Sequence, residues 1–327
     1  MRQPGTVAEV VQRASPRHIS LAVAAVGTSP DVVHRGGAEV APGRALWQVG
    51  SITKVFTALV LARSVVRGEV SLDTPVRRIL GWAPADITLG QLATHTAGLP
   101  RIPPELWTRA LRRDPDPYAD LDGAALAASL ERLRRRGVGR VRYSNLGFGL
   151  LGLALATAAG TTYDELVRAE VGDPLGLGDT STSAAVERRL TGHTRRLRPR
   201  PTPWHFQDAM AGCGALWSSI EDMQAFVGAV LDPPPGELGE AMRLAARTHV
   251  SARGHDQGLG WIRFTRGPAA GHLFHNGGTY GFRSSLLADP STRSGVVALT
   301  NVDRSVDGLV VSALGADGLP HPSVGGV

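Results

Sequence analysis

The segment that decides the fold is Gly50-Ser51-Ile52-Thr53-Lys54, which opens an apolar stretch closed by Gly68. The apolar residues of this stretch recur at helical spacing, and glycine commonly follows the last residue of a helix. We therefore predict a helix that has Ser51 as its N-cap or in its first turn. Residues three apart share one face of a helix, so we expect the Ser51 hydroxyl to meet the Lys54 amine.

Lys54 is the only lysine in the chain. All the others of the 35 lysine and arginine residues are arginines. Arginine keeps its proton under ordinary conditions, whereas a buried lysine can lose it. Burial and the positive end of a helix both disfavour an ammonium, so a neutral amine could take the Ser51 proton. The same helix end favours the oxyanion that forms on attack. Taken alone, S-x-x-K also fits a capping serine followed by a solvated lysine.

Two further segments contain groups suited to acyl transfer. Tyr143-Ser144-Asn145 precedes the Gly-rich start of an apolar helical run. A tyrosine near cationic groups can relay a proton, and an asparagine offers a donor and an acceptor to an amide substrate. In His275-Asn276-Gly277-Gly278, the glycines allow a ligand to approach the backbone, and the Gly278 N–H could complete an oxyanion hole with that of Ser51. Taken alone, Asn145 also fits a helix cap, and Asn276-Gly277 fits a hairpin turn.

The periodicity of the sequence changes twice along the chain. Short β-rich runs lie between about residues 18 and 47, helical spacing prevails from 51 to about 226, and strand-like runs return from about 258. This order predicts an α+β fold in which one antiparallel sheet, formed from both chain ends, is flanked by helices and carries an inserted, mostly helical region. The expected strands include residues 19–23, 45–47, 259–264, 284–288 and 295–300.

The three chemical segments, in this order, resemble the serine β-lactamase and penicillin-binding-protein superfamily. The resemblance is strongest to its class C-like branch, which includes esterases, D-amino-acid peptidases and related acyltransferases. That family shows S-x-x-K, then Y-x-N, then K-T-G or H-x-G. Secondary matches, within a resemblance that covers about residues 40 to 301, are Thr94 to Leu99, Pro174 to Leu177, Ala211 to Ser219 and Gly258 to Trp261.

The resemblance implies a five-stranded type of sheet, a helical second region and an active site between them. We accordingly expect a sheet domain of residues 1–70 and 215–327 and a helical domain of residues 71–214. Carried over by residue, the resemblance makes Ser51 the acylated nucleophile, Lys54 its proton acceptor and Tyr143 the proton relay to the leaving group. Its substrate-binding residues are Asn145, His275, Gly277 and Gly278.

One position departs from the lysine-bearing members of the family. His275 stands where many β-lactamases have a lysine, which weakens the binding of a substrate carboxylate by a fixed cation. This feature is more similar to the esterase and peptidase members. No segment of the sequence resembles the Glu-bearing loop of class A β-lactamases.

These features predict a serine hydrolase or acyltransferase that acts on a small-molecule ester or amide, with an esterase, amidase or β-lactamase-like activity. An amide-forming acyltransferase of a biosynthetic pathway is the alternative, because hydrolysis and aminolysis share the acyl-enzyme and an amine can replace water. A non-catalytic, penicillin-binding type of sensor is less favoured, since all three motifs and the sole lysine are retained. The sequence leaves the substrate and the oligomeric state open.

Other classes of function are disfavoured by composition and motifs. The net charge is +6, but the basic clusters at 132–142 and 195–200 lack interleaved aromatic residues, so we expect no nucleic-acid partner. Gly147 to Gly152 fits G-x-G-x-x-G but lies within a helical run, and no paired metal-ligand motif is present, so we expect no cofactor and no metal. Cys213 is the single cysteine, so no intramolecular disulfide can form. Residues 1–5 show no signal-peptide pattern and no run approaches the length of a membrane span, so we expect a cytoplasmic protein without a membrane partner.

Overall fold

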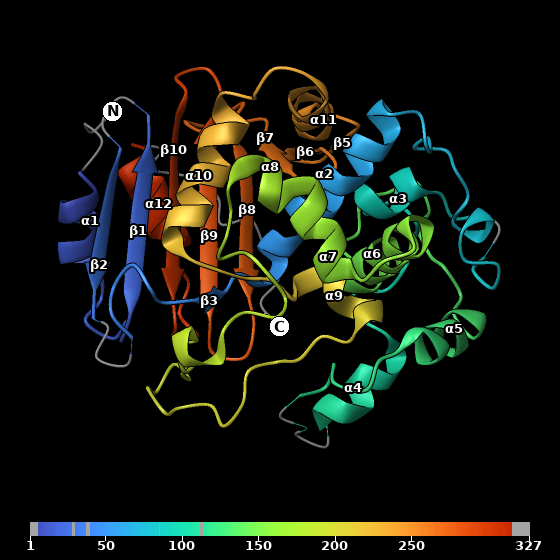
Figure 1. The fold of residues 1–327 in the computed structure, drawn as a ribbon, viewed down its shortest axis with the longest axis horizontal. Helices are drawn as coiled ribbons and strands as arrows, with labels where there is room; N and C mark the ends of the chain where they lie inside the picture. Colours follow the sequence, from blue (N-terminus) through green and yellow to red (C-terminus); the bar gives the residue numbers. More distant parts are fainter. Residues whose placement is uncertain are drawn as a thin grey trace.

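Both ends of the chain contribute strands to one antiparallel sheet, so the predicted α+β fold is confirmed. The structure is a computed structural model that describes residues 6–27, 30–36, 40–84, 86–111, 114 and 116–315. Residues 1–5, used above for the signal-peptide prediction, lie outside this part of the chain. Figure 1 shows the long strands on one side of the molecule and helices α3 to α7 on the other.

The sheet has eight strands in the order β2-β1-β10-β9-β8-β7-β6-β5. Five of them are long, which matches the expected five-stranded type, and three short strands extend the sheet at the β8 side. A separate two-stranded sheet pairs β3 with β4. The strand bounds are β1 Leu21–Val26, β2 Asp31–Arg35, β3 Trp47–Gln48, β4 Trp217–Ser218, β5 Val250–Ala252, β6 His255–Gln257, β7 Ile262–Phe264, β8 Leu273–Gly278, β9 Arg283–Asp289 and β10 Ser294–Thr300.

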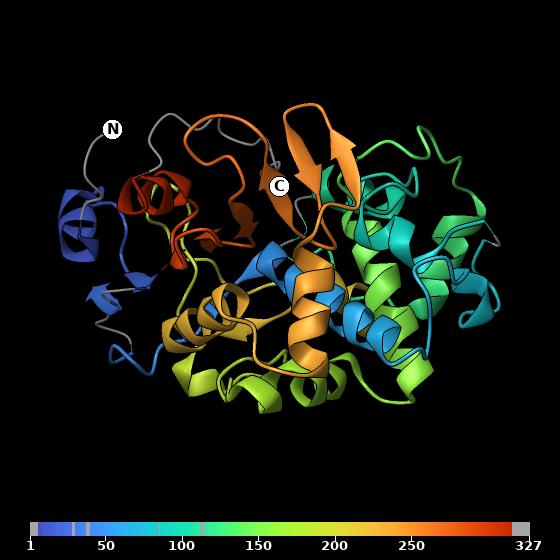
Figure 2. The same ribbon diagram turned by 90° about the horizontal axis from the view of Figure 1, so that it is seen from above.

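Helices cover both faces of the sheet, which explains why β1, Leu21–Val26, is apolar along its whole length. Leu21 and Val23 of β1 pack in the cluster formed with α1 (Val7–Arg13) and α12 (Asp307–Ala313). Ala22 and Ala24, which alternate with them, belong to the main core with α10 (Ile220–Leu231). Figure 2 shows α1 and α12 on one side of the sheet and α10 on the other.

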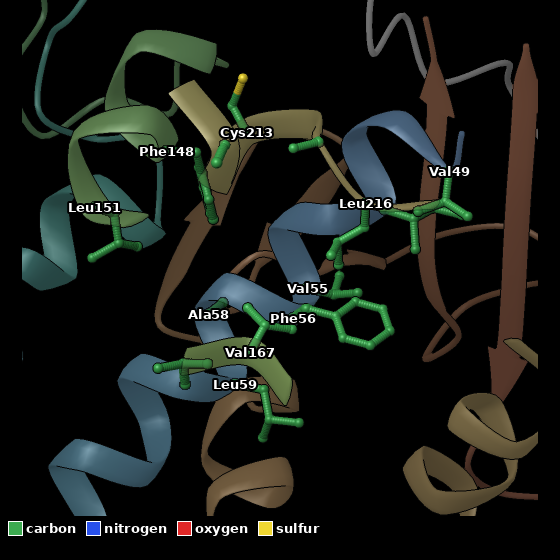
Figure 3. Close-up of a cluster of buried hydrophobic side chains, with 14 of the residues drawn as sticks. Val49, Val55, Phe56, Ala58, Leu59, Phe148, Leu151, Val167, Cys213 and Leu216 are labelled. Carbon is green, nitrogen blue, oxygen red and sulfur yellow. The ribbon is translucent and has the colours of Figure 1, made fainter. Parts of the chain in front are cut away.

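Helix α2 (Thr53–Val66) runs through the middle of the molecule and is buried from its first residue to Ala62. Figure 3 shows its side chains Val55, Phe56 and Leu59 among residues of other elements, including Phe148 and Val167. The remaining helices are α3 Leu89–Ala93, α4 Pro104–Leu111, α5 Gly123–Glu131, α6 Asn145–Ala159, α7 Tyr163–Val167, α8 Asp173–Leu175, α9 Asp208–Gly214 and α11 Glu237–Ala246. The helix predicted after Ser51 therefore exists and ends next to Gly68, as expected.

Glycines allow α6 and α9 to approach closely beside α2. A Cβ atom on Gly152 would lie 2.8 Å from the Gly212 Cα atom, so neither position has room for a side chain. The G-x-G-x-x-G pattern of residues 147–152 thus lies within α6 and forms part of the contact between α6 and α9. This close crossing fixes where the C-terminal end of α9 meets α2.

Polar side chains of α2 complete the same contact. Thr57 Oγ1 donates to the Gly212 carbonyl at 2.8 Å and lies 2.6 Å from the Tyr163 hydroxyl. The Thr53 hydroxyl accepts a hydrogen bond from the Leu216 N–H at 3.2 Å. At the other end of α2, Arg63 contacts the Glu237 carboxylate at 2.8 Å. These bonds hold α2 in a defined position along its length.

Three expected strands differ from the observed ones. The strand expected at residues 19–23 is shifted along the chain and spans Leu21–Val26. The strand expected at residues 259–264 begins only at Ile262, because Gly258 and Gly260 lie in a bend in which the Gly258 N–H bonds to the Trp261 carbonyl. The strand expected at 45–47 is instead the short strand β3. No single helix in the described ranges is long and apolar enough to cross a membrane; one pair, Asn145–Ala159 with Tyr163–Leu175, reaches that length and composition together and is bent by 83°. The proposed domain bounds stay a prediction.

We predict that Thr57→Val lowers the free energy of unfolding by about 1–3 kcal/mol, because the buried Gly212 carbonyl and Tyr163 hydroxyl both lose a partner. The measurement is urea denaturation followed by circular dichroism. Thr57→Ser keeps the hydroxyl and loses only a methyl group, so it should cost less, about 1 kcal/mol. An equal loss in the two variants would show that the hydroxyl is not needed at this position.

Candidate active site

Ser51 lies in a tight turn rather than at the cap of the helix. A 3-10 turn spans Gly50–Ile52 and runs directly into α2, whose N-cap residue is Ile52. Gly50 has a φ of +53°, in the left-handed region that glycine adopts without strain. The Ser51 side chain is half-buried, whereas Lys54 is fully buried. The turn therefore presents the serine hydroxyl at the edge of the core.

Two side chains converge on the Ser51 hydroxyl. Lys54 Nζ donates to Ser51 Oγ at 3.0 Å, from the next turn of the same helix. The Tyr143 hydroxyl donates to the same oxygen at 2.6 Å, from the segment just before α6. Both groups are at hydrogen-bond distance, so either can exchange a proton with the serine. The structure thus brings together the three residues that the sequence proposes as catalytic.

The Lys54 amine is held by the C-terminal end of α9. It donates to the Cys213 carbonyl at 2.6 Å, and its Nζ atom lies 4.9 Å from the centre of the Tyr143 ring. Carbonyls in the last turn of a helix have no partner within the helix, so the amine fills a vacant bond. The Cys213 thiol has a different role: burial raises its pKa to about 11, which leaves it protonated and unreactive.

The Tyr143 ring is held by His95, to which the sequence assigned no role. The two rings lie 4.6 Å apart between centres, and His95 Nδ1 accepts the backbone N–H of Ser144 at 3.1 Å. Burial lowers the pKa of His95 well below its usual range, and the charge of Lys54 adds to this effect. His95 is therefore a neutral ring with its proton on Nε2. Its backbone φ of +59° is rare for a residue other than glycine.

Asn145 is the first residue of α6, but it does not cap the helix. Ser144 is the cap, since its hydroxyl accepts the Gly147 N–H at 2.9 Å. Asn145 Nδ2 is 3.5 Å from the Tyr118 hydroxyl, and its Oδ1 atom is buried without a hydrogen-bond partner among the described residues. A buried carboxamide with an unused acceptor fits the predicted contact with a substrate amide.

Strand β8 brings two glycines against the Ser51 turn. A Cβ atom on Gly277 would lie 2.1 Å from the Val49 carbonyl oxygen and 2.9 Å from the Ser51 nitrogen, so only glycine fits. A Cβ atom on Gly50 would lie 2.7 Å from the Gly278 nitrogen. The backbone of residues 49–51 thus packs directly on that of residues 277–278. This contact places the Ser51 and Gly278 N–H groups close together, as an oxyanion hole requires. The Asn276-Gly277 pair lies within a strand and not in a hairpin turn.

His275 is buried on β8 and is neutral. Burial lowers its pKa to about 3, and the charge of Lys54 acts in the same direction. Its Nδ1 atom lies 2.8 Å from the Asn276 carbonyl and must donate to it, which leaves Nε2 as an acceptor. His275 therefore cannot supply a fixed positive charge to a substrate at neutral pH.

Sequence reasoning missed two groups of the site, the Cys213 carbonyl and the His95 ring. The Cys213 group in contact with Lys54 is a backbone carbonyl, which no side-chain pattern reveals. His95 lies in the Thr94 to Leu99 segment that resembles the family, and the segment gives no sign that its ring contacts Tyr143. In the described part of the chain, no group of three or more His, Cys, Asp or Glu residues could hold a metal ion.

Comparison with known proteins agrees with the architecture. A family model described as Beta-lactamase matches residues 7–317, so the chain belongs to the β-lactamase family. The chain is 26% identical over 308 residues to the D-alanyl-D-alanine-carboxypeptidase/endopeptidase AmpH of Escherichia coli (strain K12), which covers 84% of this chain and 78% of AmpH. It is 27% identical over 326 residues to Esterase EstB of Burkholderia gladioli, with 84% of this chain and 77% of EstB covered.

A solved class C β-lactamase from Rhodobacter sphaeroides has the same fold. It superposes with a TM-score of 0.80 at 23% sequence identity and covers 94% of this chain and 97% of its own. The predicted resemblance to the β-lactamase and penicillin-binding-protein superfamily is confirmed by these matches.

We predict that kcat/KM holds or rises as the pH goes from about 6 to 8, because a His275 with a lowered pKa has already lost its proton throughout this range. The measurement is a pH profile with a 4-nitrophenyl ester for wild type and for His275→Gln, which should have the same shape. A steep loss above pH 7 in wild type that disappears in the glutamine variant would contradict the neutral assignment.

Proposed function

We propose that the protein is a serine hydrolase that forms an acyl-Ser51 intermediate on an ester or amide and passes the acyl group to water. The observation that carries this proposal is the convergence of Lys54 Nζ, at 3.0 Å, and the Tyr143 hydroxyl, at 2.6 Å, on Ser51 Oγ. AmpH and EstB, by their names a peptidase and an esterase, support a reaction at an acyl bond.

In the first step, Ser51 Oγ attacks the carbonyl carbon of the substrate. Its proton passes to Lys54, directly or through the Tyr143 hydroxyl, since both contact the same oxygen. Lys54 suits this role because its other contact, the Cys213 carbonyl, is uncharged and does not compete for a proton. An arginine in its place could not accept the proton.

In the tetrahedral intermediate, the negative oxygen would lie between the Ser51 and Gly278 N–H groups. These are backbone donors whose position is fixed by the packing of residues 49–51 on residues 277–278, so they need not reorganise during the reaction. Asn145, with its unused Oδ1 acceptor, is placed to hold an amide N–H of the substrate.

Collapse of the intermediate breaks the bond to the leaving group, which takes a proton from the Tyr143 hydroxyl, and Lys54 passes the proton that it received from Ser51 on to Tyr143. Water then attacks the acyl-enzyme by the reverse sequence, with the same two residues returning the proton to Ser51. An amine that entered in place of water would give the amide-forming alternative. A screen of activated esters with and without amine acceptors, read by mass spectrometry, distinguishes the two outcomes.

We predict that wild-type protein gains the mass of a fluorophosphonate label and that Ser51→Ala gains none, because the alcohol that attacks the label is gone. Intact-mass spectrometry measures the adduct. Ser183→Ala, which removes an exposed serine away from the site, is the matched control and should label fully. A persistent adduct on Ser51→Ala would refute the assignment of the nucleophile. A lack of any adduct on wild type would favour the alternative that the protein is a non-catalytic sensor.

A second prediction concerns the base. Lys54→Arg should lower kcat nearly as much as Lys54→Ala, about 100- to 10,000-fold, because arginine keeps its proton although it preserves the charge. Steady-state kinetics with a 4-nitrophenyl ester measure the effect. Wild-type activity in Lys54→Arg would mean that only a positive charge is required at this position.

A further inference from the structure

A row of aromatic side chains leads away from the candidate active site. Tyr118 lies 4.6 Å from Phe206 and 5.2 Å from Trp204, measured between ring centres. Trp204 in turn stacks on Tyr280, with ring centres 6.0 Å apart and planes within 11°. These four residues come from the segment before α5, the segment before α9 and the turn after β8, so distant parts of the sequence build the row.

The inner end of the row contacts the groups that surround Ser51. The Tyr118 hydroxyl meets Asn145 Nδ2 at 3.5 Å. A Cβ atom on Gly214 would lie 3.1 Å from Phe206 Cζ and 3.8 Å from the carbonyl carbon of Gly50, which precedes Ser51. The Phe206 ring therefore lies in the space beside Gly214, next to the nucleophile turn.

The outer end of the row carries the Arg200 guanidinium, which forms no salt bridge with a carboxylate of the residues that the structure describes. The Arg200 guanidinium lies 3.9 Å from the centre of the Tyr280 ring, and Arg200 Nε is buried with no hydrogen-bond partner in the described structure. The Asp303 backbone carbonyl accepts a hydrogen bond from Arg195 of the same loop, but its carboxylate is occupied by Arg283, whose Nε donates to it at 2.8 Å. A guanidinium stacked on a ring presents its planar edge of N–H donors, which suits a carboxylate.

The ring on which this cation stacks is close in sequence to the reaction centre. Tyr280 follows Gly278 by two residues, so their Cα atoms are at most about 7 Å apart. The acyl oxygen is expected at Gly278, and the leaving group is expected at Tyr143, which belongs to a different element. The row therefore borders the acyl part of a substrate.

We propose that Arg200, together with the Tyr280 and Trp204 rings, forms a subsite for a carboxylate at the far end of the acyl group. The enzyme then prefers substrates whose acyl group is an apolar chain or ring that ends in a negative charge. This inference rests on the proposed acyl-Ser51 reaction and deepens it, because it names the acyl class. It also gives a function to the basic loop at residues 195–200, in which Arg195 and Arg198 are exposed while Arg200 is half-buried.

The test compares two 4-nitrophenyl esters with six-carbon acyl groups: the hexanoate, which is neutral, and the mono-adipate, which ends in a carboxylate. Kinetics are corrected for spontaneous hydrolysis. In Arg200→Ala, the ratio of kcat/KM for the adipate to that for the hexanoate should fall about 10- to 100-fold relative to wild type, as expected for loss of a hydrogen-bonded charge pair. Arg198→Ala removes the same charge from the same loop and should keep the ratio within about two-fold. Circular dichroism checks that both variants fold.

An unchanged ratio in Arg200→Ala, or an equal fall in both variants, overturns the subsite. A second measurement separates this inference from the acyl-enzyme. Saturation-transfer NMR on Ser51→Ala, with monomethyl adipate and methyl hexanoate as probes, detects binding without chemistry. If Ser51→Ala binds the adipate and the double variant Ser51→Ala/Arg200→Ala does not, the result supports the subsite. This holds even if neither ester is turned over by wild type, in which case only the acyl-Ser51 proposal falls. Equal binding to both proteins overturns the subsite, whatever the rate of hydrolysis.

Discussion

The hydrogen bond from Lys54 to the Cys213 carbonyl is the contact on which the site depends. It joins the first turn of α2 to the last turn of α9, and Thr57 repeats the connection one turn further along through the Gly212 carbonyl. The close crossing of α6 and α9 at Gly152 and Gly212 sets the position of α9. Because Tyr143 lies two residues before α6, the same crossing also affects where the Tyr143 hydroxyl meets Ser51.

The sheet completes this arrangement from the opposite side. Gly277 has no side chain, so the backbone of β8 packs directly against the Ser51 turn. On the neighbouring strand β9, the Ser284 hydroxyl donates to the Val49 carbonyl at 2.7 Å. Both histidines that face the site, His95 and His275, are held neutral by burial. Lys54, the one lysine in the chain, is therefore surrounded by neutral histidines. The Arg200 cation lies at the far end of the aromatic row, away from the proton transfers.

Local chemistry made part of this structure predictable. The i, i+3 spacing of Ser51 and Lys54 needs only a helix, and the apolar pattern after Lys54 predicts one. The placement of strands at both chain ends follows equally from short-range periodicity. The prediction was less accurate where glycine bends the chain, as at Gly258 and Gly260, which delay β7 until Ile262.

Contacts that depend on backbone groups or on distant segments could not be predicted. The Cys213 carbonyl carries no sequence signature, and the ring contact between His95 and Tyr143 requires two loops to meet. The same holds for the row from Tyr118 to Tyr280, whose members are separated by up to half of the chain. Family motifs identified the positions, and the three-dimensional packing supplied their partners.

The central claim is that Ser51, Lys54, Tyr143 and the Gly278 backbone act on one reacting centre. A crystal structure of the protein after reaction with diisopropyl fluorophosphate tests this most directly. The account predicts a phosphorus atom bonded to Ser51 Oγ and a phosphoryl oxygen at about 2.7–3.1 Å from both the Ser51 and Gly278 nitrogens. Lys54 Nζ and the Tyr143 hydroxyl should remain within hydrogen-bond distance of Ser51 Oγ. Phosphorylation of another residue, or a phosphoryl oxygen directed away from the Gly278 nitrogen, would contradict the account.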